Sequence, residues 1–242
     1  MSRIILMALV LAATVAGCNR FPDLTIQITD NLQPSDPPEC AFESEQDESL
    51  LRGLWDLNVD SGYIMVPRIA SYIFDNSLAT QAPQGNITVA NYEVAVKLPD
   101  NSIPELSGGL PNPYSVTTSA VIPPSQAFGE ISRGIGAAIM IPASYRNALL
   151  DLAAASGFSS IVLDIRANGN TAGGFFQQSP PFSWPIDLCQ GCLGIVCTEG
   201  EIPEVCFPGQ DGDTYCTSVV PPAPQGRVAA AADYLERTDE AT

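Results

Sequence analysis

Residues 86–98 read NITVANYEVAVKL and carry the clearest strand pattern in the chain. Apolar and polar residues alternate from Tyr92 to Leu98, and β-branched residues are frequent, which is typical of a strand with one buried face. The following residues, 99–114, contain four prolines and indicate a long loop. This long alternating strand favours an all-β domain.

Other stretches of the chain show shorter apolar patterns separated by turn residues. Residues 63–74 form an apolar run interrupted by Pro67, which indicates an edge strand or a bend. Gly134 and Gly136 leave one face of the strand at residues 131–141 without bulky side chains, as expected where another backbone approaches closely. We expect strands at residues 24–29, 54–59, 63–74, 86–98, 115–122, 131–141, 161–166 and 182–188.

One amphipathic helix is predicted at about residues 142–156. Pro142 suits its first turn, and Gly157 suits its end. Its apolar face, which is suited to covering the open end or face of a sheet, is formed by Tyr145, Leu149 and Leu152. Short strands with punctuating turns and one helix predict a mainly β fold, with the strands arranged as an immunoglobulin-like β-sandwich.

The first residues resemble a bacterial export signal. Arg3 supplies a positive charge, and residues 4–16 form an apolar run that is shorter than the about 20 residues needed to span a bilayer. The run leads into VAGC at residues 15–18, which resembles the lipobox of bacterial lipoproteins. This resemblance implies that residues 1–17 are a lipoprotein signal peptide and that Cys18 carries lipid. The alternative is an ordinary secretory signal that happens to contain a cysteine.

The resemblance also implies where the protein resides. Two or three acyl chains on Cys18 anchor a protein stably without a transmembrane helix. The next residue is Asn19 rather than aspartate, which by the sorting rules of Gram-negative lipoproteins favours the outer membrane. The membrane is therefore an expected partner, reached through lipid on Cys18.

The chain is strongly acidic, with 27 Asp and Glu residues and a formal net charge of −17. A field of this sign repels phosphate backbones, which excludes nucleic acid as an expected partner. It also opposes adsorption to anionic lipid, so membrane attachment has to be covalent. The local run of acidic residues at 43–48 predicts a solvated segment.

The residue types that are missing limit the possible chemistry. The chain contains no histidine, which excludes a Ser-His-Asp triad, a Cys-His pair and any histidine-ligated metal. Lys97 is the only lysine, and its place at the end of an alternating run predicts an ammonium group in solvent. Catalysis by paired carboxylates stays open, but nothing in the pattern selects a pair. We therefore expect no catalytic residues and no cofactor.

Six cysteines remain when Cys18 is set aside, and an even number in an exported chain predicts three disulfides. These are Cys40, Cys189, Cys192, Cys197, Cys206 and Cys216. Five of them lie within residues 189–216, and an odd number cannot pair internally. Full oxidation therefore requires Cys40 to reach a cysteine of the tail, which closes a loop of roughly 150 residues.

Two motifs in the tail allow sharper hypotheses. Cys189 and Cys192 have the C-x-x-C spacing of a thiol-redox pair, and several thiolates are able to bind zinc. Asp211 and Asp213 flank a glycine and are a weak candidate for a calcium site, although the full spacing of a calcium loop is missing. We favour a structural disulfide framework because redox pairs need a helix N-terminus and exported cysteines are usually oxidised.

These features divide the chain into five parts. We predict a signal peptide at 1–17, a lipid-anchored tether at 18–49 and the β-sandwich domain at 50–188. A cysteine-rich tail follows at 189–218. The Pro/Ala-rich terminus at 219–242 is expected to be flexible.

The motifs at both ends resemble those of uncharacterised cysteine-tailed lipoproteins of myxobacteria. The resemblance rests on VAGC at 15–18, PIDLCQGCL at 185–193 and CFPGQD at 206–211. It implies a place in the cell envelope and carries no activity. We expect a non-enzymatic structural or binding role, with an envelope protein or glycan as a candidate ligand. The alternative is an extracytoplasmic enzyme or thiol-redox protein that uses Asp and Glu residues, or Cys189 and Cys192.

Overall fold

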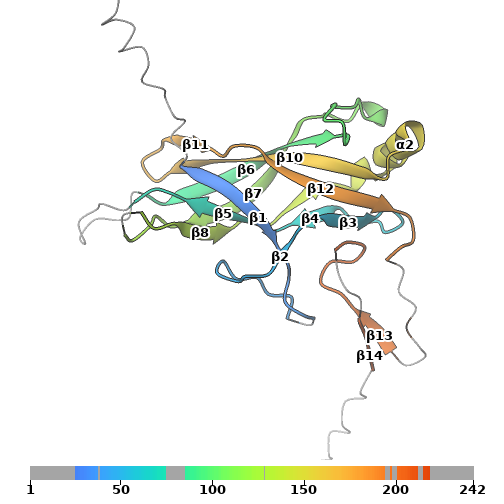
Figure 1. Cartoon of the computed structure of the whole chain (residues 1–242), viewed down its shortest axis with the longest axis horizontal. Coiled ribbons are helices and arrows are strands. Elements are labelled where there is room, and N and C mark those ends of the chain that lie inside the picture. The colour runs from blue at the N-terminus through green and yellow to red at the C-terminus, as the bar shows by residue number, and fades with distance from the viewer. Residues whose placement is uncertain are drawn as a thin grey trace, which may run out of the picture.

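The computed structural model describes residues 25–37, 39–74, 85–127, 129–193, 197, 201–211 and 215–218 (Figure 1). The predicted signal peptide, Cys18, Asp213 and the terminus at 219–242 lie outside the described residues. The described part of the chain is mainly β, which confirms the predicted fold class.

The larger sheet is built around the stretch at residues 86–98. Its strands run in the order β3 (Gly53–Asp56), β12 (Phe182–Cys189), β10 (Ser160–Thr171), β6 (Ile87–Lys97) and β7 (Tyr114–Ile122), and β11 (Phe176–Gln178) pairs with β10. All neighbours are antiparallel except β3, which joins β12 in parallel. The predicted long strand therefore lies inside the sheet rather than at its edge.

A smaller sheet and two short ribbons complete the strands. The smaller sheet has the order β2 (Ser49–Leu50), β1 (Ile26–Leu32), β5 (Pro67–Ser71) and β8 (Ser132–Ile135). The ribbons pair β4 (Tyr63–Met65) with β9 (Ala138–Ile141), and β13 (Glu201–Glu204) with β14 (Tyr215–Ser218).

The two main sheets share one hydrophobic core. Ile28 and Ile69 from the smaller sheet are buried in the same cluster as Val94 and Ile165 from the larger sheet. Each fully buried aliphatic side chain contributes about 1.5–3 kcal/mol relative to an exposed one. In Figure 1 the two sheets lie close against one another along the long axis of the molecule.

The immunoglobulin-like arrangement is not confirmed. Each of two predicted strands is split, because the run at 63–74 breaks at Val66 into β4 and β5, and the run at 131–141 breaks at 136–137 into β8 and β9. The bend expected at Pro67 is therefore present. β4 and β9 pair with each other outside both main sheets, so the sheets are joined by a ribbon.

The predicted helix is confirmed. A 3₁₀ turn (Ala143–Tyr145) leads into α2 (Arg146–Ser156), which ends at Gly157 in the left-handed conformation with φ 72°. The Gly157 N–H donates to the carbonyl of Ala153 at 2.9 Å, as in a glycine helix end. Ala148 and Leu149 are buried against the core, so the helix covers one end of the larger sheet (Figure 1).

The domain begins before residue 50. β1 pairs with β5 from Ile26 to Asn31, and the side chains of Ile26 and Ile28 are fully buried. Part of the segment expected to be a tether therefore belongs to the smaller sheet. The apolar alternation of β1 is the physical reason, because its buried face needs a partner.

Both Gly134 and Gly136 are closely approached, but another backbone makes the approach, as predicted, only at Gly134. A Cβ atom at Gly134 would lie 3.2 Å from the carbonyl oxygen of Val121 in β7. A Cβ atom at Gly136 would lie 2.1 Å from the hydroxyl oxygen of Tyr92. That buried hydroxyl donates to the carbonyl of Gly136 at 2.7 Å, so glycine lets β6 bond directly to the connection between β8 and β9.

We predict that Gly136→Ala destabilises the domain by about 1–3 kcal/mol, the usual cost of overpacking. Urea unfolding of the purified protein measures this change. Tyr92→Phe removes the hydroxyl that the new methyl group meets, so adding it to Gly136→Ala should cost less than it costs alone. Strictly additive losses would contradict the assigned contact.

Candidate functional site

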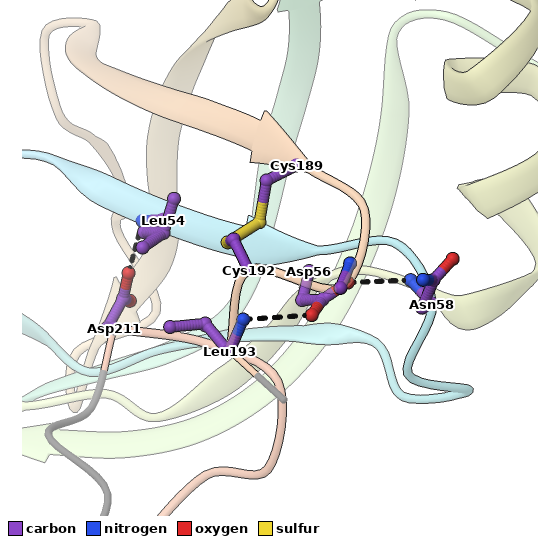
Figure 2. Close-up of a disulfide and its surroundings, with 8 residues drawn as sticks. Leu54, Asp56, Asn58, Cys189, Cys192, Leu193 and Asp211 are labelled. Carbon is purple, nitrogen blue, oxygen red and sulfur yellow. Dashed lines mark hydrogen bonds between the residues drawn. A yellow bond between two sulfur atoms is a disulfide. The ribbon is translucent and has the colours of Figure 1, made fainter. Parts of the chain in front are cut away.

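The candidate site lies where β3 and β12 end side by side. Asp56 and Cys189 are register partners in these strands, and Cys189 forms a disulfide with Cys192 (Figure 2). The N–H of Leu57 donates to the carbonyl of Cys189 at 2.8 Å, which continues the pairing by one residue. Strand pairing therefore places a carboxylate directly beside the C-x-x-C loop.

Asp56 holds this loop in place through backbone hydrogen bonds. Its side chain is buried, and it accepts the N–H groups of Asn58 at 2.9 Å, Gly191 at 2.7 Å and Leu193 at 3.0 Å (Figure 2 shows the first and last). Burial pushes the pKa of Asp56 upward, but these three donors and the nearby Arg146 outweigh it and hold the pKa below its usual range. The ionised carboxylate thus clamps the cysteine loop to β3.

Asp56 is one of 27 acidic residues, and it was not among the predicted site residues. A signal was present, because Asp56 interrupts the apolar run LWDLNV at 54–59. An aspartate inside a buried strand needs hydrogen-bond donors close by. One donor, Asn58, is local, but the other two are Gly191 and Leu193, whose proximity depends on the parallel pairing of β3 with β12.

The same three residues form a possible metal-ligand group in the described part of the chain. One ligand atom each from Asp56, Cys189 and Cys192 lie within 4.8 Å of one another. The two sulfur atoms are joined in a disulfide and are not thiolates, and the carboxylate already accepts three hydrogen bonds. This donor set does not fit a resident metal ion.

The environment also disfavours thiol-redox chemistry at Cys189 and Cys192. Cys189 ends a strand, and the N–H groups of Gly191 and Leu193 donate to Asp56 rather than to a sulfur atom. The carboxylate of Asp56 lies within 4.8 Å of the two sulfur atoms, and the negative charge disfavours a thiolate there. The arrangement suits a structural disulfide better than a reactive one.

An open groove runs beside this disulfide. It is lined by Leu150 and Ala154 of α2, by Phe158 after the helix, and by Leu188 and Cys189 of β12. Its volume is about 400 Å³. The groove is open to solvent and has few polar side chains, so it offers contact area without a catalytic group.

The cysteine tail docks against the start of the domain. Cys40 and Cys206 form a disulfide across 166 residues, which is the link between the domain start and the tail that cysteine parity requires. The rings of Phe42 and Phe207 stack beside it with their centres 5.8 Å apart. The tail after Cys206 is therefore held to the β domain by covalent and apolar contacts together.

Gln210 extends the edge of the ribbon formed by β4 and β9. Its side-chain amide is buried and pairs with the backbone of Ile64, accepting from the N–H and donating to the carbonyl at 2.7 Å each. The bidentate contact copies the hydrogen bonds of a neighbouring strand. No local sequence pattern indicates this contact, because it depends on the docking of the tail.

Asp211 lies inside this interface rather than in an exposed loop. One carboxylate oxygen accepts the N–H of Leu54 and the other accepts the hydroxyl of Tyr63, both at 2.5 Å. Burial raises the pKa of Asp211 to about 6, although both hydrogen bonds act in the opposite direction. These contacts occupy both oxygens, which argues against the weak calcium candidate formed with Asp213, a residue outside the described part of the chain.

Lys97 is not directed freely into solvent as expected. Its ammonium group forms an ion pair with Asp164 of β10, and both side chains are about four-fifths buried. Asp164 also accepts the hydroxyl of Ser183 at 2.6 Å. Cross-strand pairing between β6 and β10 brings the two charges together. A lysine that is paired with a carboxylate is not available as a free base, so we interpret the ion pair of Lys97 with Asp164 as structural.

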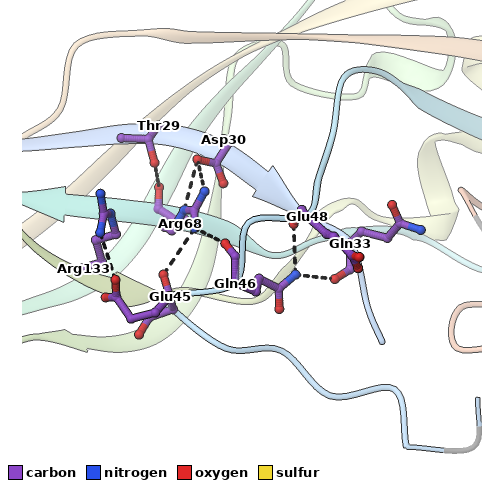
Figure 3. Close-up of polar contacts among 9 residues, drawn as sticks. Thr29, Asp30, Gln33, Glu45, Gln46, Glu48, Arg68 and Arg133 are labelled. Atoms are coloured by element: carbon purple, nitrogen blue, oxygen red, sulfur yellow. Dashed lines mark hydrogen bonds and ion pairs between the residues drawn. The ribbon is translucent and has the colours of Figure 1, made fainter. Parts of the chain in front are cut away.

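The acidic side chains of the segment at 43–48 are exposed, as predicted, but the backbone of the segment is attached to the smaller sheet. Arg68 of β5 donates to Asp30 of β1 at 2.8 Å and to the carbonyl of Gln46 at 2.5 Å (Figure 3). Arg133 forms an ion pair with Glu45 at 2.9 Å. Arginine side chains from two strands therefore fix the segment that follows Cys40, the partner of Cys206.

The chain matches no protein-family model, no curated protein and no solved structure. Among the described residues, none of the helices has the length and apolar character needed to cross a membrane.

We predict that Asp56→Asn loosens the C-x-x-C loop and makes the Cys189–Cys192 disulfide easier to reduce. The asparagine side chain keeps one acceptor oxygen, but its NH₂ group faces at least one of the backbone N–H groups that Asp56 accepts. The hydrogen bond lost there costs about 1–3 kcal/mol of stability. Alkylation after mild dithiol treatment, followed by mass spectrometry, measures the reduced fraction. Asp60→Asn on the same turn is the control and should behave as wild type. Equal reduction in both variants would refute the clamp.

We also predict that stability falls as pH rises through the titration of Asp211. Its pKa is about 6 in the folded protein against 3.8 in the unfolded chain, so the folded state binds more protons between these values. The stabilisation that Asp211 contributes is fully present below pH 3.8 and is lost as the pH rises through about 6. Urea unfolding across this range measures the slope.

Asp211→Asn mimics the protonated acid and should flatten that pH dependence. The amide oxygen still accepts from Leu54, and the amide nitrogen faces the hydroxyl of Tyr63. Asp211→Ala removes both contacts and should lower stability at every pH. A wild-type slope retained in Asp211→Asn would show that another group is responsible.

Proposed function

We propose that this protein is an exported lipoprotein, held in the outer membrane by lipid on Cys18, with a non-enzymatic structural or binding role. The observation that carries the proposal is the use of cysteine. Cys40 pairs with Cys206, Cys189 pairs with Cys192, and Cys197 is also disulfide-bonded. Such disulfides persist in oxidising compartments outside the cytoplasm.

Cysteine arithmetic also supports lipid on Cys18. Seven cysteines cannot all pair, and one of them has to have another role. Cys18 is the residue that follows the lipobox-like sequence VAG. If Cys18 carries lipid, Cys216 is the only cysteine left to pair with Cys197.

The role of the domain is inferred from its chemistry. The described residues offer ion pairs and hydrogen bonds that hold strands together, and the candidate site near Asp56 is occupied by structural contacts. The groove beside α2 is apolar and open, which suits contact with an envelope protein or glycan. A binding or scaffolding role uses these surfaces without requiring a nucleophile or base.

The alternative is an extracytoplasmic enzyme or thiol-redox protein. The redox version has the C-x-x-C pair in its favour and the carboxylate of Asp56 against it. The hydrolytic version needs two carboxylates facing a shared cleft. The open groove beside α2 is lined by no carboxylate, so it does not supply such a pair.

We predict that the full chain, expressed in a Gram-negative bacterium fed with labelled palmitate, incorporates the label and fractionates with the outer membrane. Cys18→Ser should remove the label, because no other cysteine follows a lipobox. Gel fluorography and membrane fractionation measure both results. A labelled Cys18→Ser protein would contradict the assignment of the lipid.

Asn19→Asp is the matched control for location. It keeps the cysteine and should keep the label, but it should shift the protein toward the inner membrane. An unlabelled wild-type protein would overturn the anchor, whereas an unchanged location of Asn19→Asp would overturn only the sorting step.

A further inference from the structure

Exposed apolar side chains gather at the end of the domain opposite α2. Tyr72, Ile131, Val121, Phe175 and Phe176 are between 39% and 71% exposed. Figure 1 shows that β11, the start of β1 and the start of β8 lie at this end, whereas α2 lies at the other. We call these five residues the apolar rim.

Backbone contacts place the rim residues at the same end of the two sheets. Tyr72 donates its N–H to Thr25 at 2.9 Å, and Ile131 directly precedes Ser132, the register partner of Ser71. On the larger sheet, Phe176 pairs with Asn170, and Val121 pairs with Thr88 near the start of β6. Asn170 and Thr88 are themselves register partners, so Phe176 and Val121 lie in one row across the sheet. A side-chain hydrogen bond from Thr25 to Gln177 joins the two sheets here.

This end of the domain is nearly free of charge although the chain as a whole has a net charge of −17. One acidic residue, Glu130, and one basic residue, Arg133, are present in the described segments that build it. These segments are residues 25–27, 71–74, 85–90, 119–127, 129–133 and 168–178. The acidic repulsion that opposes lipid contact elsewhere is therefore weak at the rim.

The rim also lies where the chain arrives from the lipid anchor. Thr25 is the residue before β1, and it is seven residues after Cys18. Seven residues span at most about 25 Å when fully extended. Lipid on Cys18 therefore keeps this end, and not the end with α2, close to the bilayer surface.

We propose that the apolar rim docks onto the lipid surface and holds the domain upright on the membrane. This inference rests on the proposed anchoring through Cys18. Aromatic side chains favour the membrane interface, where their rings contact acyl chains and headgroups. A short linker makes the contact intramolecular, so a few exposed rings suffice where they would bind weakly alone. The occupant is a zwitterionic lipid surface, because the rim has no cluster of cations.

Tryptophan fluorescence tests the contact on the lipidated full-length protein. Phe175→Trp and Ile131→Trp place reporters on the two sheets of the rim, and Phe158→Trp places a matched reporter at the α2 end. Each position is exposed, and the native Trp55 and Trp184 are buried. The proteins are purified from membranes, reconstituted into phosphatidylcholine vesicles and quenched with lipids that carry bromine on the acyl chain. Urea unfolding shows that each variant is folded.

If the rim docks on lipid, tryptophan fluorescence is quenched several-fold more strongly at residues 175 and 131 than at residue 158. Equal quenching at all three positions, with lipid present on Cys18, would overturn docking and leave the anchor standing. Shielding of residue 175 without vesicles, growing with protein concentration, would assign the rim to a second copy and also overturn it. Mass spectrometry that finds no lipid on Cys18 would overturn the proposed function and this inference with it.

Discussion

The disulfide between Cys40 and Cys206 is the constraint on which the arrangement of the protein depends. It links the segment before β2 to the tail across 166 residues and encloses most of the β domain. A chain-entropy account values such a closure at about 5 kcal/mol. The link also places Gln210 and Asp211 on the edge formed by β3 and β4, where each side chain satisfies backbone groups that the strands leave open. The tail is therefore part of the folded domain.

The two ends of the domain have opposite chemistry. The end with α2 carries the cysteine loop, the carboxylate of Asp56 and the docked tail, all of which are fixed by hydrogen bonds or disulfides. The other end carries exposed aromatic residues such as Phe175 and almost no charge. This polarity fits a domain that is attached at one end and presents the other to the envelope. Under the proposed anchoring through Cys18, the groove beside α2 faces away from the membrane.

Local patterns predicted the elements, and long-range contacts decided their assembly. Alternation at residues 86–98 and the glycine end at Gly157 were sufficient for β6 and α2, because these signals act within a few residues. The split at Val66 depends on which sheet each half joins, which no local pattern encodes. Asp56 and Gln210 were not found for the same reason, since Gly191 and Ile64, which bond to them, lie more than 130 residues away from them. Parity alone predicted that Cys40 reaches the tail, but choosing Cys206 required the fold.

Disulfide mapping of the unreduced, membrane-purified protein tests the closure of the domain most directly. Proteolysis without reduction, followed by mass spectrometry, identifies which cysteine-containing peptides are linked. A peptide pair that joins Cys40 to Cys206, together with a separate link between Cys189 and Cys192, is the predicted result. A free Cys40, or Cys40 linked to another cysteine, would contradict the docking of the tail on which the whole arrangement depends.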